Sequence, residues 1–333
     1  MSERRKYSKL RLAVPSKGAL SEPTMAFFER AGLKLARPNA RRYTGKMAGV
    51  DDVEVLYQRA SEIPAKILDG TVDVGVTGLD IVREEFDQAE ILVLMEDMGF
   101  GRADLVLAVP DSWMDVQSIG DFADLTWEWK SRGREARIAT KFPRLTSRYL
   151  AEHGVNYFRL VASHGATEIA PEMGVADCIS DLTSSGATLK DNHLKVVQGG
   201  RIFRSQACLI GSRTSLGRSE KFLGRVRMIL EMCEAVERAR QVSVLAALVD
   251  RADAKALREA LEAALGRETR VDLLETGDGG LVRAEVYAPR ARMYEALGVC
   301  RRFTTRPVGA NRVDYLFEAT SPAYKSLLHQ LKG

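Results

Sequence analysis

A run of small residues between a strand pattern and a helix pattern is the part of this sequence best suited to chemistry. Asp181 ends the apolar run ADCISD, and a helical pattern begins near Ala187. Between a strand and a helix start, backbone N–H groups and the helix dipole point into the loop, where only small side chains let a phosphate come close. The loop consists of Thr183, Ser184, Ser185, Gly186, Ala187 and Thr188, and its hydroxyl groups add further donors. A plain helix cap has the same composition, so the loop alone leaves both interpretations open.

Two carboxylates accompany this loop. Asp181 stands at its lip, and Glu168 lies 13 residues earlier, where a helical pattern starts at Thr167. Carboxylates repel phosphate but accept hydrogen bonds from sugar hydroxyls, worth roughly 1.5 to 3 kcal/mol each. The set therefore fits a ribose 5-phosphate better than a bare anion. For Glu168 the alternative is a favourable charge at a helix N-terminus.

The elements that must position these residues alternate along the chain. Short β-rich apolar runs start at Leu10, Val53, Val72, Ile91, Ala103, Arg137, Phe158, Ala176 and Lys195, with helical patterns between some of them, near 21–31 and 62–69. Such alternation predicts an α/β fold with largely parallel sheets. The stretch from Trp113 to Gly133 contains WEWKSRGRE and fits no regular element, so we expect an inserted surface loop there.

The C-terminal part of the sequence has a different pattern. Apolar residues between Ser219 and Val242 recur with a helical period, which predicts a connecting helix. The segments VSVLAALV, DAKALREALEAAL, RVDLLE, LVRAEVYA and RVDYLFEA then give strands and a helix in a β-α-β-β pattern, followed by the helical run SPAYKSLLHQLKG. Residues 243–333 are therefore predicted to form a small α+β domain.

Composition excludes several classes of protein. A length of 333 residues exceeds the usual size of one domain, so two or three compact units are expected. A net charge of +4 gives no argument for a nucleic-acid partner. No apolar run is long enough for an export signal or a membrane span, so we expect a cytosolic protein. The four Cys and four His have no metal-ligand spacing, which predicts buried reduced thiols and no metal site made by side chains alone.

The region around the loop resembles the ATP phosphoribosyltransferase family. The family's signature pattern is matched at every spacing by Glu168, Gly174, Ala176, Ile179, Asp181, Leu182, Ser185, Gly186, Thr188 and Leu189. The segments VPSKGALSEP, RASEIPAKILDGTVDVGVTGLD, RIATKFP and RSQACLI extend the resemblance over residues 10 to about 240. The resemblance implies a glycosyltransferase of the pentosyl class that joins N1 of the ATP adenine to C1 of 5-phosphoribosyl-1-pyrophosphate (PRPP). Pyrophosphate leaves with inversion at C1, and the reaction is the first step of histidine biosynthesis.

The resemblance also implies a role for the residues around PRPP. The loop from Thr183 to Thr188 would hold the 5-phosphate, and Glu168 and Asp181 would hold the ribose hydroxyls. Mg²⁺ is the implied cofactor, and it would accompany the pyrophosphate.

Basic residues near the N-terminus match the family less completely. Arg59 matches an Arg that stabilises the departing pyrophosphate, and Lys17 would contact the pyrophosphate or the ATP phosphates. Arg42 is a weaker candidate for the same anionic site. Many family members have Arg where this chain has Ala19, so Lys17 would supply more of the positive charge that contacts the ligand phosphates. Apart from the resemblance, a solvated surface position explains each of these cations.

The family's fold places two α/β lobes around a cleft, as in periplasmic binding proteins. The resemblance implies one lobe of residues 1–104 with 194–242, a second of residues 105–193 that carries the PRPP loop, and a ferredoxin-like or ACT-like domain of residues 243–333. In the long form of the family this last domain binds histidine as feedback inhibitor; the alternative is a domain that only stabilises the oligomer. Dimers assembling into hexamers are implied. The alternative function is a non-catalytic small-ligand-binding or regulatory protein of the same fold.

Overall fold

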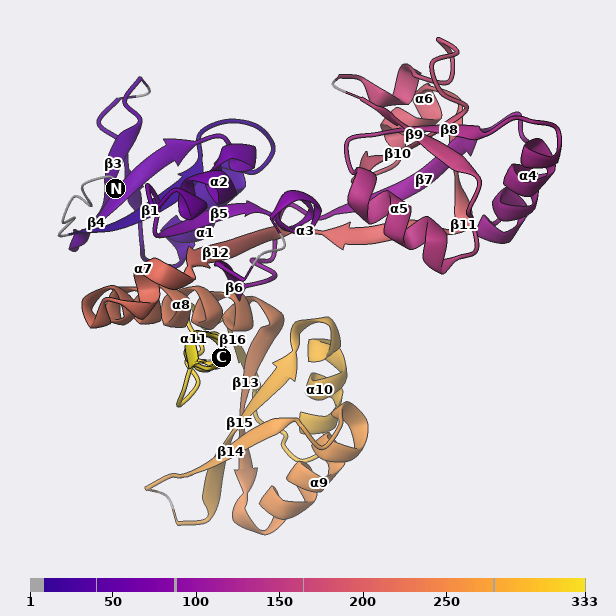
Figure 1. Cartoon of the computed structure of the whole chain (residues 1–333). Coiled ribbons are helices and arrows are strands. Elements are labelled where there is room, and N and C mark those ends of the chain that lie inside the picture. Colours follow the sequence, from indigo (N-terminus) through magenta and orange to yellow (C-terminus); the bar gives the residue numbers. More distant parts are fainter. Residues whose placement is uncertain (1–8, 40, 87–88, 164, 278, 333) are drawn as a thin grey trace. The chain divides into compact units, whose positions relative to one another are not determined.

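The chain folds around three β-sheets. The structure is a computed structural model that describes residues 9–39, 41–86, 89–163, 165–277 and 279–332. Its contacts divide the chain into two compact units, one of residues up to Ala26 with Leu35–Leu223 and one of Phe27–Lys34 with the residues from Gly224 onward. The first unit contains two of the sheets, and the second unit contains the third (Figure 1).

The first sheet joins strands from both ends of the first unit. Its order is β2 (Leu35–Ala36), β3 (Thr44–Met47), β4 (Val50–Gln58), β1 (Leu10–Pro15), β5 (Val74–Gly78), β12 (Ala207–Ser212) and β6 (Ile91–Met95). The helical elements beside it are α1 (Ser21–Arg30), η1 (Ala60–Glu62), α2 (Ile63–Leu68), α3 (Leu79–Glu85) and α7 (Arg213–Gly217). β1 is parallel to both β4 and β5, and every residue of β1 and β5 is buried. Continuous apolar runs are typical of strands covered on both faces.

The second sheet is built from the chain between the two ends of the first. Its order is β11 (Leu194–Ser205), β7 (Ala103–Pro110), β10 (Cys178–Thr183), β8 (Ala136–Thr140) and β9 (Phe158–Ala162). The helical elements here are α4 (Ile119–Ser131), α5 (Pro143–Glu152), η2 (Thr167–Ile169) and α6 (Ala187–Asp191). β8 runs parallel to β9 and β10, while β7 is antiparallel to its neighbours.

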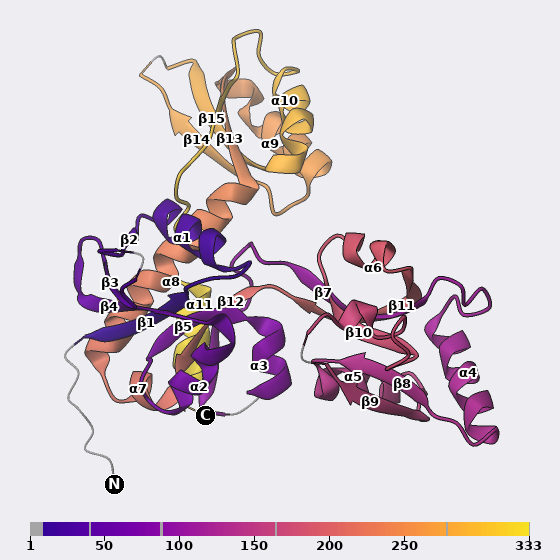
Figure 2. The same ribbon diagram turned by 90° about the horizontal axis from the view of Figure 1, so that it is seen from above.

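The expected surface loop between Trp113 and Gly133 is wrong, because most of this stretch is helix α4, which lies beside β11 (Figure 1, Figure 2). Ser118 and Asp121 form a capping box at its start, so that each side chain binds the backbone N–H of the other residue. Phe122 and Thr126 are fully buried on its inner face. The polar Thr126 interrupts the apolar stripe, yet its hydroxyl donates to the carbonyl of Ala123, so it is buried without an unmet hydrogen bond.

Two buried carboxylates of α3 connect it to the second sheet's elements. Glu84, which is 4% exposed, accepts hydrogen bonds from the backbone N–H groups of Arg144 (2.7 Å) and Leu145 (2.9 Å) in the first turn of α5. Asp80 accepts a hydrogen bond from the hydroxyl of Ser205, the last residue of β11. Both carboxylates therefore hold the region where the chain passes between the two sheets.

The third sheet confirms the α+β domain at the C-terminal end. Its order is β14 (Arg270–Glu275), β15 (Leu281–Pro289), β13 (Val242–Asp250) and β16 (Gly309–Asn311), all antiparallel. Figure 1 shows α9 (Ala254–Leu265) and α10 (Met293–Cys300) on one face of this sheet, after the short turns η3 (Arg251–Asp253) and η4 (Arg290–Arg292). The chain order β-α-β-β-α-β and the strand order are those of the ferredoxin-like fold.

The expected strand RVDYLFEA is wrong. The fourth strand is β16, which ends at Asn311, and the residues after it run without regular structure to an added helix, α11 (Pro322–Lys332). This tail packs on α8 (Glu220–Gln241): the N–H of Leu316 donates to the carbonyl of Ala235 at 3.0 Å, and the N–H of Ala323 donates to Glu234 at 2.9 Å. The apolar side chains of the segment face this packing rather than a sheet, since Leu327 is fully buried.

The expected fold class is confirmed: a two-lobed α/β core and a small C-terminal α+β domain. The domain boundaries stay a prediction, and β11, which starts at Leu194, still pairs with β7 in the second sheet. The four cysteines are buried and free, as expected, and burial raises the pKa of the Cys178, Cys208 and Cys233 thiols.

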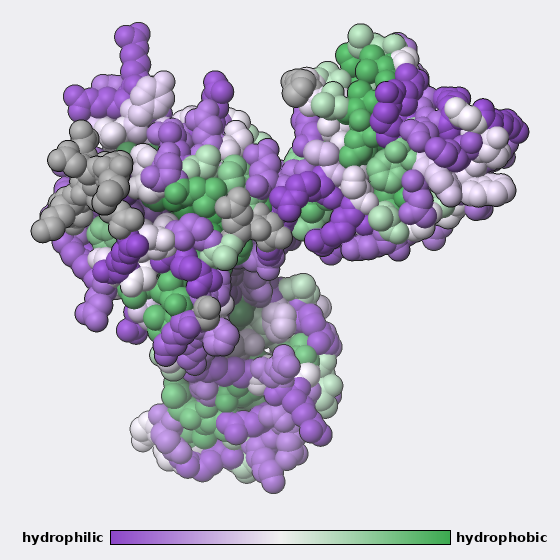
Figure 3. Space-filling model, viewed as in Figure 1, coloured by the Kyte–Doolittle hydropathy of each residue, from purple (hydrophilic) through white to green (hydrophobic). Residues whose placement is uncertain are grey.

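In the view of Figure 3, hydrophilic side chains cover most of the surface, and apolar side chains form smaller patches between them. Among the described residues, no helix is both long and apolar enough to cross a bilayer.

Candidate functional site

The predicted phosphate loop lies at the carboxyl end of β10. The first three residues of this strand are buried and the last three, from Asp181, are partly exposed, so the strand leaves the core where the predicted site begins. Gly186 has φ +73°, a left-handed conformation that favours glycine, and it is the N-cap of α6. A Cβ atom at Gly186 would meet nothing within 4 Å, so the loop faces open space there.

Hydrogen bonds within the loop are those of a short helix cap. The N–H of Gly186 donates to the hydroxyl of Thr183 at 2.9 Å, and the N–H of Ala187 donates to the hydroxyl of Ser185 at 3.3 Å. Ser184, Ser185 and Thr188 are exposed. Helix α6 has only five residues, so its macrodipole is small and the N–H and hydroxyl donors are the main attraction for an anion. The loop therefore combines small residues, a left-handed glycine and several donors that a phosphate could share.

Asp181 is placed beside a lysine that the sequence reasoning missed. One oxygen of the Asp181 carboxylate accepts from the N–H of Leu182 at 2.8 Å, and the other lies 3.8 Å from Nζ of Lys141. Lys141 follows β8, the parallel neighbour of β10, and Thr140 pairs with Ser180. Because parallel strands end at one edge, a Lys immediately after RIAT was the available signal. The pair places a positive and a negative charge side by side at the loop.

Glu168 lies on a 3-10 turn rather than at the start of a helix. The turn η2 covers three residues, and Thr167, fully buried, shares a hydrogen bond of 2.9 Å with the hydroxyl of Ser163. η2 packs against β10, so the structure brings Glu168 and Asp181 onto adjacent elements. No ion pair of Glu168 with another described residue is present, and the residue is partly buried.

The basic candidates gather at one edge of the first sheet. β1 and β4 are parallel with Pro15 opposite Gln58, and the N–H of Ser16 donates to the carbonyl of Gln58 at 2.7 Å. Lys17 and Arg59, which follow these two strands, therefore share the carboxyl edge. Arg59 is 61% exposed, and its guanidinium lies 3.7 Å from Glu62.

Arg42 belongs to the same edge. It is exposed in the loop before β3, and the carbonyl of the next residue, Tyr43, accepts from the N–H of Tyr57 at 2.9 Å, next to the end of β4. The predicted residues thus form two groups, with three cations on the first sheet and the loop with two carboxylates on the second.

The buried Asp80 is a second residue that the sequence reasoning did not single out. It follows Gly78, the N-cap of α3, and its N–H donates to the hydroxyl of Ser205 at 3.1 Å while that hydroxyl donates to its carboxylate. Burial raises the pKa of Asp80, against the lowering effect of the hydrogen bond from Ser205. Its place at the ends of β5 and β11 suits a positioning role at the junction of the lobes.

Comparisons with known proteins point to one family. A family model described as HisG, ATP phosphoribosyltransferase, matches residues 59–235. A protein of Bradyrhizobium diazoefficiens named ATP phosphoribosyltransferase is 40% identical over 95% of this chain and 96% of its own length. A Brucella melitensis protein of the same name is 47% identical over 66% of this chain and 98% of its own length. A chain of the ATP phosphoribosyl transferase (HisG:HisZ) complex from Thermotoga maritima superposes with a TM-score of 0.52 and 26% identity, over 68% of this chain and 96% of that one.

These relatives have two lengths. The Bradyrhizobium protein is matched almost from end to end, whereas about a third of this chain has no counterpart in the Brucella protein. Relatives with and without a region equivalent to that third therefore carry the same name.

Proposed function

Since the chain belongs to the ATP phosphoribosyltransferase family, we propose that it transfers the phosphoribosyl group of PRPP to N1 of the ATP adenine, with release of pyrophosphate, as the first step of histidine biosynthesis. Among the described features, the β10–loop–α6 segment supports this most directly. Its residues match the family signature, and its left-handed Gly186 opens the loop to a ligand. The alternative of a non-catalytic ligand-binding protein is not favoured, because the relatives matched over most of the chain carry the enzyme's name.

The reaction belongs to the pentosyl class of glycosyl transfer. The bond from C1 to the pyrophosphate oxygen breaks while the bond from C1 to N1 of adenine forms, and positive charge develops on the ribosyl carbon. Such a step needs orientation of the two substrates and neutralisation of the leaving group more than a strong base. This requirement is consistent with a site that contains cations, carboxylates and small polar residues.

Each group of residues has a part in this proposal. The loop from Thr183 to Thr188 holds the 5-phosphate through N–H and hydroxyl donors, and Glu168 and Asp181 accept hydrogen bonds from the ribose hydroxyls. Lys141 orients Asp181 by its charge, at 3.8 Å. The cations at the edge of the first sheet, Arg59, Lys17 and Arg42, bind the pyrophosphate and the ATP phosphates.

Mg²⁺ is the proposed cofactor. Within the described residues no group of three metal-binding side chains is present. In this proposal the ion is held mainly by phosphate oxygens and water. When bound, the ion would reduce the charge of the pyrophosphate.

The remaining parts of the proposal concern partners and place. We assign histidine binding to the C-terminal domain, and a dimer-to-hexamer assembly and a cytosolic location to the protein. That domain has a ferredoxin-like topology. Relatives of the length of the Brucella protein carry the same name although about a third of this chain has no counterpart in them, so we assign regulation rather than catalysis to the domain.

Pyrophosphate release tests the proposed reaction. The full-length protein, incubated with ATP, PRPP and Mg²⁺, should release one pyrophosphate for each phosphoribosyl-ATP detected by mass spectrometry. Omission of any one component should abolish release. A folded protein that releases none, or that releases pyrophosphate from PRPP without a nucleotide product, contradicts the proposal.

A further inference from the structure

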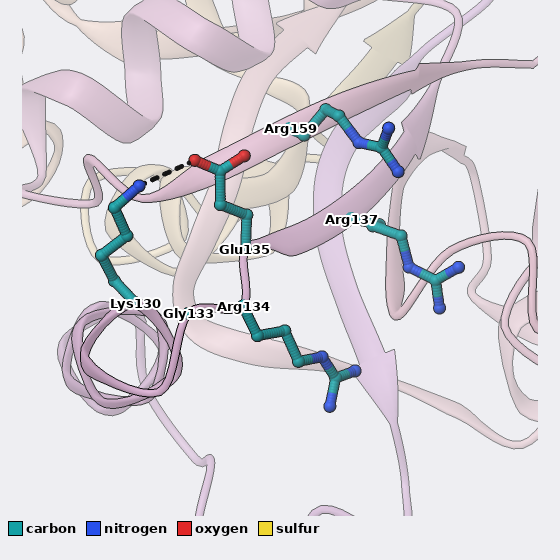
Figure 4. Close-up of a pocket in the computed structure, with 6 residues that line it drawn as sticks. All are labelled: Lys130, Gly133, Arg134, Glu135, Arg137 and Arg159. Carbon is teal, nitrogen blue, oxygen red and sulfur yellow. Dashed lines mark hydrogen bonds and ion pairs between the residues drawn. The ribbon is translucent and has the colours of Figure 1, made fainter.

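A basic hollow lies on the second sheet, away from every predicted site residue. It has a volume of about 490 Å³ and is lined by Lys130, Gly133, Arg134, Glu135, Arg137 and Arg159 (Figure 4). Arg137 and Arg159 stand near the amino ends of the parallel strands β8 and β9. The phosphate loop follows the carboxyl end of β10, which is parallel to β8, so the two places occupy opposite edges of one sheet.

Two of the arginines are direct neighbours. Arg137 pairs with Arg159 in the register of β8 and β9, so their side chains leave the sheet on the same face. Like charges directly opposite each other destabilise a sheet. Figure 4 shows the guanidinium groups of Arg134, Arg137 and Arg159 directed to the same side. Three cations facing one region create a strong positive potential there.

Carboxylates compensate only part of this charge. Asp177, whose side chain is 6% exposed, binds both Arg134 and Arg137, and Lys130 pairs with Glu135 at 3.0 Å. Burial tends to raise the pKa of Asp177, but the hydrogen bonds from Arg137 and Arg134 outweigh it and lower the pKa. The side chain of Arg159 has neither a hydrogen bond nor an ion pair with any residue that the structure describes. Four cations therefore face two carboxylates, which leaves a surplus of about two positive charges.

Two of the guanidinium groups are held in place before any ligand arrives. Arg137 donates to Asp177 and, at 2.8 Å, to the carbonyl of Gly174. The guanidinium carbon of Arg134 lies 3.8 Å from the ring centre of Trp129, which packs edge-on against Trp113. Fixed donors lose little conformational entropy on binding, which favours affinity.

We propose that this hollow is a second anion site, which binds the phosphate group of a small phosphorylated molecule or inorganic phosphate. A phosphate dianion matches the surplus charge, and arginine forks suit its oxygens. Because the site lies at the opposite edge from the predicted 5-phosphate loop, its ligand does not compete for that loop. The proposal is independent of the proposed function, and either can fail without the other.

Tryptophan fluorescence gives a local measurement of binding. The three tryptophans of the chain are Trp113, Trp127 and Trp129, all in or just before α4, whereas the phosphate loop contains none. Titration of the full-length protein with inorganic phosphate, at constant ionic strength, should produce a saturable change as the anion binds next to Arg134, whose guanidinium group stacks on Trp129. Ribose 5-phosphate as a second probe distinguishes a phosphate ester from the free ion.

A matched pair of variants locates the binding. Arg159→Gln removes one charged donor and should weaken phosphate roughly tenfold to a hundredfold. Arg148→Gln removes another exposed arginine, on α5, where it pairs with Glu152, and should leave the curve unchanged. Both variants should keep the parent's turnover in the absence of phosphate.

Crystals soaked in tungstate, a phosphate mimic with anomalous scattering, show the site directly. Tungsten within hydrogen-bonding distance of Arg159 and Arg137 supports the proposal. Tungsten at the loop from Thr183 to Thr188 with none in the hollow overturns it, as does an equal effect of Arg159→Gln and Arg148→Gln on the phosphate titration.

Discussion

Asp181 is the carboxylate whose surroundings are best defined among the predicted PRPP contacts. We expect Asp181→Asn to lower kcat/KM for PRPP roughly tenfold to a hundredfold, because an amide accepts hydrogen bonds from ribose hydroxyls more weakly than a charged oxygen. The Asn oxygen can still accept from the N–H of Leu182, so the melting temperature should stay within a few degrees of the parent's. Steady-state kinetics with PRPP as the varied substrate checks this, and a value within twofold of the parent's would remove Asp181 from the site.

Arg59 has a proposed role that predicts a particular kinetic signature. A contact to the leaving group strengthens as negative charge develops, so Arg59→Ala should lower kcat by about 10²-fold and change KM for ATP much less. The side chain is 61% exposed, so stability should not change. Single-turnover rates check the chemical step. The control is Arg102→Ala, which removes an exposed Arg paired with Asp97 and should keep the parent's rate. Equal rates for the two variants would show that Arg59 does not contact the leaving group.

Asp80 predicts a pH dependence of stability. Burial raises its pKa in the folded state, so that state binds more protons than the unfolded chain between the two pKa values. The contribution of Asp80 to the free energy of unfolding therefore falls as pH rises through this interval. Asp80→Asn keeps an acceptor for Ser205 without the buried charge. The melting temperature of the variant minus that of the parent should therefore increase as pH rises from 4, and should become constant once Asp80 is ionised in the folded parent. Asp124→Asn, on the exposed face of α4, is the control, and a difference independent of pH would contradict the argument.

The sequence predicted single residues only where spacing along one segment was enough. Asp181 and the loop follow each other directly, so their proximity needed no fold. Lys141 lies 40 residues before Asp181 and meets it only because β8 and β10 are parallel neighbours. Ser205 and Asp80 are likewise separated along the chain by a whole sheet. Contacts of this kind depend on strand order, which no local pattern contains.

At the scale of elements, the proposed phosphate binding by the turn from β10 to α6 can be tested separately from the backbone strain that a substitution causes there. Gly186→Val puts a β-branched side chain into the open side of the loop, and should abolish measurable PRPP binding while the protein stays folded. Gly154→Val is a strain-matched control, because Gly154 also has a left-handed conformation (φ +76°) with nothing within 4 Å of a Cβ atom. Both variants should lose stability by about 1 to 3 kcal/mol. Calorimetric titration with PRPP checks binding, and a folded Gly186→Val that binds as tightly as the parent would exclude the proposed 5-phosphate site.

Most elements were predictable because their patterns are local. The apolar runs for β1, β5, β6 and β7 and the periodic helix α8 appear in the structure where the sequence indicated them. Helix α4 was missed because a buried Thr126 breaks its stripe, although Ser118 and Asp121 gave a capping signal. The segment after Asn311 has the alternation of a strand but packs on α8, since β16 already occupies the edge of the sheet beside β13.

At the scale of the whole molecule, the C-terminal domain can be separated from the core by truncation. A chain ending at Gln241 should keep catalytic activity and lose histidine binding, whereas the full-length protein should bind histidine. The truncated chain should also be less stable than the full-length protein, because it lacks the tail that buries Leu327 and donates a hydrogen bond to Glu234. Calorimetric titration of both proteins with histidine checks this prediction. Equal binding by both chains, or by neither, would leave the domain with a structural role only.

A second truncation separates stability from regulation. Removal of residues 312–333 alone takes away the tail but keeps all four strands of the third sheet. We expect this chain to melt at a lower temperature than the parent and still to bind histidine. Loss of histidine binding here would place the pocket on the tail rather than on the ferredoxin-like domain.

The position of β12 in the first sheet governs the order in which the protein can fold during synthesis. β12 separates β5 from β6, and β6 pairs with no other described strand. The ribosome therefore releases the apolar β6 about 110 residues before its partner, a delay of roughly 6 to 22 s at ordinary rates of translation. The second sheet, made entirely from residues 103–205, has all its strands before β12 emerges. The nascent chain thus completes its middle sheet first, and the apolar β6 stays without its strand partner until Ser212 has left the exit tunnel.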